Sequence, residues 1–289
     1  MRVKSFLNSL LSPTITIHSW GGFGSQLFTA YLVLKLQHYH PKRRLRVVVH
    51  TSGVTRRDSE LDFRVLGVEM IEKDDFSPKI DTVDIKFNNV SQYFSRKIKN
   101  LGKKSMLKLG FLCTLNDDRI LSSIKPWTIS IRGHYTQMSF DPSSIAQLYS
   151  LIRLPEYSDL QNRYGLVIHY RLGDLLYIEQ KDPIEPQRIG LVVNQIAHTS
   201  HGSILLTDSD PLESRAYIHS IPMLNEVEIE NLPPRSTLMT CVHANDFVGT
   251  NAKLSLWSAV FRQFLFNKNS FLPVELSWSE KNLLHCHWY

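Results

Sequence analysis

The sequence predicts an α/β protein with two halves, each built from alternating strands and helices. Its 289 residues suit two domains better than one. Hydrophobic residues make up 43% of the chain and charged residues 21%, which is ordinary for a protein that buries a core. Short β-branched runs alternate with helix-like segments from one end to the other, and this alternation is typical of α/β folds.

The first half opens with a strand over 14–20, followed by a glycine-containing turn and a helix that ends near His40. The β-branched run 45–51 is typical of a buried parallel strand. Strand character returns over 127–136, whereas the lysine-rich stretch 75–125 has no clear pattern.

The junction between the halves is predicted from a helix and the polar segment after it. Asp141 is placed to cap this helix and Pro142 to occupy its first turn. The polar segment 155–163 follows, so we expect one domain over 1–157 and a second over 158–289.

The second half repeats the strand and helix alternation. "YGLVIHY", "GSILLT" and "FVG" indicate buried strands, "NEVEIE" indicates an edge strand, and "PQRIGLVVNQIAH" indicates a helix. Ligands of such folds gather at the carboxyl ends of the strands. The polar residues after "LVIHY", "ILLTD" and "FVG" are therefore the candidates for a site.

The turn "GGFGSQLF" joins the first strand to the first helix. Gly21, Gly22 and Gly24 permit positive φ angles and close approach of another group to the backbone. The start of the helix adds unpaired N–H groups and a positive dipole end, and Gln26 offers a polar side chain. This combination suits an anion or a sugar, although it is equally an ordinary strand-to-helix turn.

The hexapeptide "HYRLGD" ends a strand of the second half. Alternation places His169 and Arg171 on one side, Gly173 allows a turn, and Asp174 can brace the arginine. The planar guanidinium suits a diphosphate, because it makes paired, charge-assisted hydrogen bonds. A structural Arg–Asp ion pair and a hydrogen-bonded core histidine are the alternatives.

Two further strand ends carry polar residues. In "TDSD", Asp208 and Asp210 suit a metal, a ribose, a base edge or, more commonly, a helix cap. In "VGTNAKLSLWSAV", Thr250 or Asn251 is a plausible helix N-cap, and Asn251 and Ser255 are spaced to share a helix face. We expect Trp257 to be a packing residue.

The order of these motifs resembles that of the bacterial α-1,2-fucosyltransferases. "GGFGSQLF" is similar to the family's G-G-L-G-N-Q-L-F opening, "HYRLGD" to its H-x-R-R-G-D motif, and "RGHYTQMSF" to its G-Y-x-Q segment. "TDSD" stands where the family has S-D-D, and "TLMTCVHANDFVGTNAKLSLWSA" resembles L-M-S-x-C…N-S-S-F-S-W-W-x-A. The resemblance covers most of the chain, in the right order.

The resemblance implies a GT-B architecture, with two Rossmann-like domains facing across a cleft. The N-terminal domain would lie on the acceptor side and the C-terminal domain would bind GDP-fucose, the co-substrate of an inverting transfer that needs no metal or other cofactor. Arg171 would hold the β-phosphate. The remaining donor-site positions that it implies are Gly22, Gly24, Gln26, Asp208, Thr250, Asn251 and Ser255, with His169 and Asp174 as further catalytic candidates. The acceptor would be a galactose-containing, lipid-linked surface glycan such as an O-antigen.

This chain also departs from the family. Leu172 replaces the second arginine of H-x-R-R-G-D, and Ser25 stands where asparagine is usual. Lys253 is placed to restore a positive charge near the donor phosphates. Another nucleotide-sugar donor, or a non-catalytic glycan-binding protein, therefore stays open. A general base is not identified; the candidates are His18, His169, Asp174 and Asp208.

The composition bounds the partners and the location. A net charge of +6 suits phosphate-bearing partners, and the basic runs 41–46 and 95–108 allow contact with an anionic membrane. The three cysteines lack CxxC spacing, and no apolar run is long enough to span a membrane, so we expect a cytoplasmic protein, peripheral at most. Nucleic-acid-binding motifs are absent, and the glycine turn lacks the third glycine of a dinucleotide-binding GxGxxG. The C-terminal "HCHWY" is expected to be a frayed tail, or one that packs its tryptophan, and not a metal site.

Overall fold

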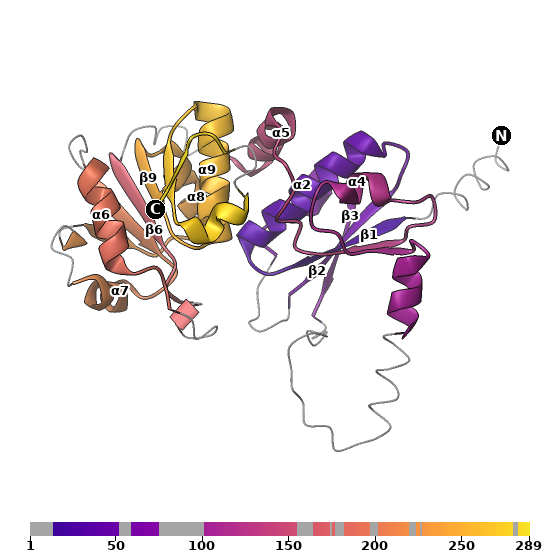
Figure 1. The fold of residues 1–289 in the computed structure, drawn as a ribbon, viewed down its shortest axis with the longest axis horizontal. Coiled ribbons are helices and arrows are strands. Elements are labelled where there is room, and N and C mark those ends of the chain that lie inside the picture. Colours follow the sequence, from indigo (N-terminus) through magenta and orange to yellow (C-terminus); the bar gives the residue numbers. More distant parts are fainter. Residues whose placement is uncertain are drawn as a thin grey trace, which may run out of the picture. The chain divides into compact units, whose positions relative to one another are not determined.

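The computed structural model describes residues 14–51, 59–74, 101–154, 164–173, 175–176, 182–196, 202–219, 224–225, 227–279 and 283–289. The chain forms two compact units, Met1–Met138 (the first unit) and Ser139–Tyr289 (the second unit). Each unit contains one parallel sheet with helices packed on it (Figure 1). The predicted α/β class with two parallel-sheet domains is thus confirmed.

The first unit has a five-stranded sheet in the order β3-β2-β1-β5-β4. Every strand pair in it is parallel. Its elements are β1 (Ile15–Trp20), α2 (Phe23–Tyr39), β2 (Leu45–His50), η1 (Phe63–Leu66), β3 (Glu69–Lys73), β4 (Leu112–Cys113), α4 (Arg119–Ser123) and β5 (Ser130–Arg132).

The start of the first unit folds as its sequence predicts. Side chains of β1 alternate between buried and half-buried, so Ile15 and Ile17 enter the core while His18 and Trp20 lie on the opposite face. Helix α2 is apolar along most of its length and packs against the core face of β1. It ends at Tyr39, next to the predicted end at His40.

The strand predicted over 127–136 is shorter, because the backbone turns sharply after Arg132. Tyr135 adopts a φ of 57°, a left-handed conformation that a strand does not accommodate. The Asn116 side chain stabilises this turn by accepting hydrogen bonds from the backbone N–H groups of His134 and Tyr135, at 2.9 and 3.3 Å. The Tyr135 hydroxyl then donates to the carbonyl of His18, which ties the turn to β1.

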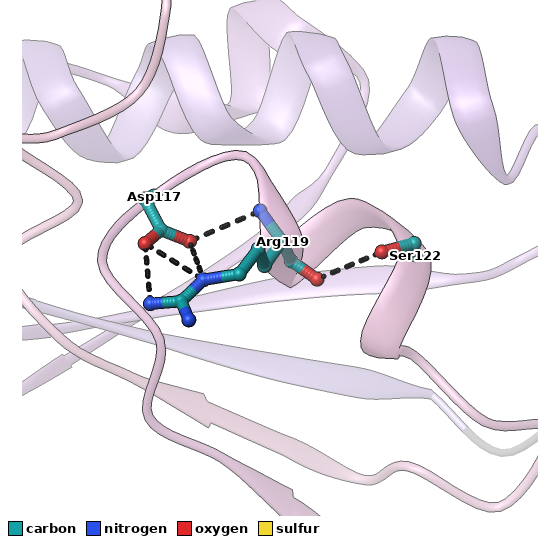
Figure 2. Close-up of polar contacts among 3 residues, drawn as sticks. All are labelled: Asp117, Arg119 and Ser122. Atoms are coloured by element: carbon teal, nitrogen blue, oxygen red, sulfur yellow. Dashed lines mark hydrogen bonds and ion pairs between the residues drawn. The ribbon is translucent and has the colours of Figure 1, made fainter.

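The loop before α4 is closed by a local ion pair. Figure 2 shows the Asp117 carboxylate accepting from the backbone N–H and the guanidinium of Arg119, the shortest contact being 2.7 Å. Ser122 donates to the Arg119 carbonyl one turn later. Because Arg119 is largely exposed, this pair orders the helix start and contributes little to stability.

The second unit has a six-stranded sheet in the order β11-β10-β9-β6-β7-β8, again with only parallel pairs. Its elements are α5 (Pro142–Ile152), β6 (Leu166–Tyr170), α6 (Pro186–Ile196), β7 (Ser203–Thr207), α7 (Pro211–Ile218), β8 (Glu228–Glu230), α8 (Pro234–His243), β9 (Asp246–Gly249), α9 (Lys253–Phe266), β10 (Ser270–Leu272), η5 (Val274–Ser279) and β11 (Cys286–Trp288). Counted from β6, the six strands follow the Rossmann order 3-2-1-4-5-6.

Both faces of the central strand β6 are covered, as its unbroken apolar sequence predicts. Figure 1 shows α6 on one face of the sheet and α8 and α9 on the other. All five residues of β6 are buried. Ile168 and Tyr170 pack into the core cluster beneath α6, whereas His169, between them, points to the side of α9.

The predicted cap of α5 is confirmed, since the Asp141 side chain accepts from the backbone N–H of Ser144 at 2.9 Å. The two compact units divide between Met138 and Ser139, 19 residues before the predicted boundary after residue 157. Helix α5 packs against α9, where the ring of Tyr149 lies against that of Phe261, and it therefore belongs to the second unit. The predicted linker 155–163 lies outside the described residues, and the acceptor and donor roles of the domains stay predictions.

The edges of the second sheet give one confirmation and one correction. β8 is an edge strand, as predicted. The C-terminal "HCHWY" is not a frayed tail: it forms β11, the opposite edge, parallel to β10. Tyr289 anchors it by donating its hydroxyl to the carbonyl of Gly249 at 2.9 Å. Backbone pairing, which a five-residue sequence does not reveal, decides this structure.

Candidate functional site

The second sheet reverses its strand order between β6 and β9. In open α/β sheets, ligands bind outside the carboxyl ends of the strands at such a switch point. Arg171 directly follows β6, Thr250 directly follows β9, and Asp208 follows the neighbouring strand β7. These residues are far apart in sequence, and the parallel register brings them to one edge of the sheet.

The loop that begins with Arg171 is held from both neighbouring strands. On the β9 side, the Thr250 hydroxyl accepts from the backbone N–H of Arg171 and donates to the carbonyl of His169, both at 3.0 Å. On the β7 side, Asp208 Oδ1 accepts from the backbone N–H groups of Leu172 and Gly173 at 2.7 and 2.8 Å. The backbone that carries the Arg171 side chain is thereby fixed at the switch point.

Gly173 is required by this packing and not by an unusual φ angle. A Cβ atom at this position would lie 2.5 Å from the Asp208 carbonyl oxygen, closer than side chains tolerate. The glycine therefore lets the loop approach β7 closely enough for the Asp208 carboxylate to bind both amides. The sequence predicted a turn at Gly173; its reason, the approach to Asp208, is a tertiary contact.

His169 is buried beneath the same loop and bonds to α9. Its Nδ1 lies 2.7 Å from the hydroxyl of Ser255, which is itself fully buried. Burial lowers the pKa of His169 to about 4, with the Asp208 charge opposing this shift and the Arg171 charge adding to it. The imidazole is therefore neutral near pH 7. The prediction of a hydrogen-bonded core histidine is confirmed, and its position next to Arg171 keeps it in the candidate site.

The first turn of α9 faces the site without the predicted cap. The N-cap position is Ala252, and among the described residues no side chain caps the helix. The predicted capping roles of Thr250 and Asn251 are wrong, because the Thr250 hydroxyl bonds across to β6 and Asn251 precedes the helix, so it does not share a helix face with Ser255. Backbone N–H groups at such a helix start favour a bound anion.

The two aspartates of "TDSD" have separate tasks. Asp210 caps α7 by accepting from the backbone N–H groups of Leu212 and Glu213, which confirms the commoner of its predicted uses. Asp208 holds the loop after β6. Within the described residues, no group of three or more His, Cys, Asp or Glu side chains is arranged to hold a metal ion.

Asp174 lies outside the described residues, so its predicted role stays a prediction. Leu172 and Trp257 have clear outcomes. Leu172, which stands where the similar motif has its second arginine, is buried in the core cluster beneath α6. Trp257 is fully buried between aromatic rings, which confirms its predicted packing role.

The glycine turn of the first unit ends at Gly22, because α2 begins at Phe23. Gly21 has a φ of 87°, whereas Gly22 is the N-cap of α2 and Gly24 already lies within the helix. Gln26 is fully buried: its Oε1 accepts from the backbone N–H groups of Glu60 and Leu61, and its Nε2 donates to the Gly21 carbonyl. Gln26 therefore fastens the turn to the segment at 60–61. Of the three glycines, only Gly21 uses a positive φ.

A ring cluster on the first sheet was only partly anticipated. His18 Nδ1 and His50 Nε2 are 2.9 Å apart in nearly coplanar rings, and the Trp20 ring stacks on His50 with centroids 4.9 Å apart. Of these three residues, only His18 is among the candidate bases predicted from the sequence. The pairing of Trp20 with His50 arises from the register of β1 and β2, which no local pattern reveals.

The basic run 41–46 is engaged within the first unit. The Arg43 guanidinium donates to the carbonyls of Lys125, Pro126 and Thr128, and Arg46 pairs with Glu69 at 2.8 Å. No helix in the described part of the chain has the length and apolar character needed to cross a membrane.

Comparisons with known proteins complete this description. No protein-family model matches the chain, and a search of curated proteins finds no match. Similar solved structures include the E. coli ADP-heptose lps heptosyltransferase II (10% identity, 96% of this chain and 90% of that chain, TM-score 0.47). For a glycosyl transferase family 9 structure from Veillonella parvula, the identity is 10%, the match covers 96% of this chain and 85% of that chain, and the TM-score is 0.45. For a putative UDP-N-acetylglucosamine 2-epimerase from Listeria monocytogenes, the identity is 11%, the match covers 90% of this chain and 79% of that chain, and the TM-score is 0.39. TM-scores below 0.5 establish no relationship in fold or function.

Proposed function

We propose that the chain is a glycosyltransferase that holds the diphosphate of a nucleotide-sugar donor at the carboxyl edge of the second sheet. The observation that carries this proposal is the fixed loop after β6. Thr250 and Asp208 hold its backbone from two neighbouring strands, so that Arg171 is presented at the switch point. A guanidinium at this place suits a diphosphate, since it can donate two parallel charge-assisted hydrogen bonds.

In the proposed reaction, negative charge grows on the diphosphate and must be stabilised by the protein. The bond between the anomeric carbon and the diphosphate oxygen breaks, and its electron pair goes to the β-phosphate. An acceptor hydroxyl attacks the opposite face of the sugar, forms the new C–O bond and loses its proton to solvent water, with inversion at the anomeric carbon. Arg171 and the N–H groups at the start of α9 stabilise the growing negative charge, and preorganised donors of this kind are the largest single catalytic term in many enzymes.

The finer identity of the donor and acceptor is proposed from motif resemblance. The ordered matches of "GGFGSQLF", "HYRLGD" and "TDSD" to the α-1,2-fucosyltransferases favour GDP-fucose as donor and a hydroxyl of a galactose-containing surface glycan as acceptor. Protein groups would supply the positive charge that stabilises the leaving diphosphate, so we propose a reaction independent of metal ions. A lipid-linked acceptor at the cytoplasmic face of a membrane is part of the same proposal. Lys103, Lys104 and Lys108, on the helical segment 101–108, would supply positive charge toward that membrane.

A second candidate is a glycan- or nucleotide-sugar-binding protein without turnover, or a transferase with another donor. The burial of Leu172 is the observation that favours this second candidate. The position that carries an arginine in the similar motif belongs here to the apolar core. One cationic group is thus missing from the loop relative to that motif. Binding without turnover is the result expected of the binding protein, whereas turnover of a nucleotide sugar other than GDP-fucose is expected of the other transferase.

The test combines donor binding with turnover. A thermal-shift panel of GDP-fucose, GDP-mannose, UDP-sugars and TDP-sugars identifies the donor, because a ligand of the folded state stabilises it by mass action. Arg171→Ala is then expected to lower kcat by about 10²- to 10³-fold, as the loss of an oxyanion donor does. Arg153→Ala, an exposed arginine of the same unit, is the matched control.

Each outcome decides between the candidates. A kcat of Arg171→Ala close to that of the unchanged protein rejects the assignment of Arg171. Stabilisation by a nucleotide sugar with no turnover favours the binding protein. Turnover that EDTA abolishes contradicts the metal-independent reaction, and stabilisation by NADH alone favours a dinucleotide-binding protein.

A further inference from the structure

The contact between His169 and Ser255 determines which ring nitrogen carries the proton. Nδ1 of His169 and the Ser255 hydroxyl are 2.7 Å apart, and both residues are buried. Within the described part of the chain, this is the one hydrogen bond that either side chain makes. The bond has two possible directions, since a hydroxyl both donates and accepts and a neutral imidazole does either at Nδ1.

The two directions differ in what they leave unpaired. If Nδ1 carried the proton and donated, the buried Ser255 hydroxyl proton would have no acceptor among the described residues. If the hydroxyl donates, its proton is paired and Nδ1 serves as the acceptor. The ring proton then lies on Nε2, which is not among the fully buried, unpartnered side-chain atoms of the described residues and can therefore donate to solvent or to a ligand. A buried donor without a partner costs about 1–3 kcal/mol, so the second direction is favoured. The proton of the neutral ring then resides on Nε2.

The surrounding packing preserves this arrangement. A Cβ atom on Gly249 would lie 2.6 Å from the Ser255 Cβ, so the glycine permits the close approach of α9 to the end of β9 that brings Ser255 to His169. On the other side, the Thr250 hydroxyl donates to the His169 carbonyl. The charges that His169 senses are the carboxylate of Asp208 and the guanidinium of Arg171.

We propose that Ser255 is a positioning residue that holds His169 as a neutral hydrogen-bond donor, with Nε2–H directed to an oxygen of the donor diphosphate beside Arg171. This proposal rests on the proposed function of the site. It excludes His169 as the general base, because Nε2 already carries a proton and Nδ1 is engaged by Ser255. It also gives Ser255, predicted to contact the donor, an indirect role.

A neutral donor suits this position better than an imidazolium. The imidazole adds a hydrogen bond to the anion without placing a second full charge beside the Arg171 guanidinium in a buried site. Its donor ability does not depend on pH over the range in which the ring stays neutral. Nucleotide binding through His169 is therefore expected to be flat between pH 6 and pH 8.

The first experiment measures the tautomer without any nucleotide. Long-range ¹H–¹⁵N spectra of the ¹⁵N-histidine-labelled full chain, assigned with His169→Gln, distinguish protonation at Nδ1 from protonation at Nε2. The expected result is a neutral ring protonated at Nε2 from pH 6 to pH 8. A ring protonated at Nδ1, or one that becomes cationic within this range, overturns the proposal.

The second experiment measures GDP binding by calorimetry. Ser255→Ala is expected to raise the Kd by about three- to tenfold and to mix the two tautomers in the NMR spectra. Ser258→Ala, which removes an equally buried hydroxyl of α9 that bonds to the Leu254 carbonyl and to Cys241, is the control and is expected to leave the Kd unchanged. His169→Gln, which keeps an N–H donor, is expected to bind within about threefold of the unchanged protein, and His169→Leu to lose about tenfold.

The outcomes separate this proposal from the function on which it rests. If Ser255→Ala binds GDP normally while Arg171→Ala does not, the positioning role is wrong and the diphosphate site stands. If Arg171→Ala retains normal affinity, or if no nucleotide binds the unchanged protein, the proposed function fails, and the role of Nε2–H toward a diphosphate fails with it.

Discussion

Arg262 offers the sharpest test of how the second unit supports its site. Its side chain is fully buried, and its guanidinium donates to the backbone carbonyls of five residues. Three of these carbonyls belong to the end of α8 and the residue after it, where a helix leaves its last carbonyls without partners. The five are Cys241, Val242, Ala244, Asn245 and Asn269, at distances from 2.6 to 3.3 Å.

Replacing this residue by methionine keeps an unbranched, apolar stem and removes every donor. The Ala244 carbonyl keeps a second partner, because Lys268 Nζ donates to it at 2.9 Å. At the low end of about 1 kcal/mol for each of the other four carbonyls left without a partner, Arg262→Met is expected to cost about 4 kcal/mol of unfolding free energy. This is a large share of the 5–15 kcal/mol that stabilises a typical domain. With a urea m-value of about 2 kcal/mol/M, the midpoint of unfolding falls by about 2 M, which is measured by tryptophan fluorescence and far-UV circular dichroism.

Arg262→Lys is the informative companion. Burial lowers the pKa of Arg262 to about 10, so the group is charged near pH 7, and lysine retains that charge without the planar fork. The lysine variant is expected to be less stable than the unchanged protein and more stable than the methionine variant. A loss below about 1 kcal/mol for Arg262→Met would refute the reasoning, since it would show that the carbonyls of Cys241, Val242, Asn245 and Asn269 find other partners at little cost.

Three further predictions concern single contacts. The folded pKa of His169, about 4, lies below its unfolded value near 6.5, so the unfolded chain takes up this proton first as the pH falls. Between pH 8 and pH 5, His169 should therefore contribute a loss of about 2 kcal/mol in unfolding free energy. This loss is measured as the difference between the unchanged protein and His169→Gln in urea titrations at each pH. Gly249→Ala forces a Cβ to 2.6 Å from that of Ser255 and should destabilise the protein by about 1–3 kcal/mol; a thermal midpoint equal to that of the unchanged protein would count against this packing. Gln26→Met leaves the N–H groups of Glu60 and Leu61 without an acceptor, which should cost about 2 kcal/mol and speed amide hydrogen exchange at both residues, whereas unchanged exchange would contradict the role of Gln26.

The elements of this fold that could be predicted are those that a pattern of a few neighbouring residues specifies. The alternation in 14–20, the apolar run before Arg171 and the Asp141-Pro142 helix start are each visible within a few residues, and each forms the expected element. Such patterns do not reveal contacts between residues that are far apart in the sequence. The strand predicted over 127–136 stops at Arg132 because Asn116, 19 residues before Tyr135, stabilises its left-handed backbone.

The candidate site follows the same division. Strand ends in an α/β chain direct attention to Arg171, Asp208 and Thr250 by local pattern alone. The hydrogen bonds that these residues make could not be predicted from the sequence. A threonine after a strand resembles a helix cap until the neighbouring strand is known. The register of β6 with β9 turns the Thr250 hydroxyl toward the His169 carbonyl and leaves Ala252 at the helix start.

The amino-acid sequence by itself determined the class of the fold, the parallel strands and the edge at which polar residues collect. These features depend on hydrophobic periodicity and on the chemistry of caps and turns, which act over a few residues. The tertiary structure alone decided which polar groups meet: Asp208 with the amides after Arg171, Ser255 with His169, and Arg262 with the end of α8. Hydrogen bonds require atoms within about 3 Å of each other, and only the packed sheet and helices bring residues so distant in sequence to that separation.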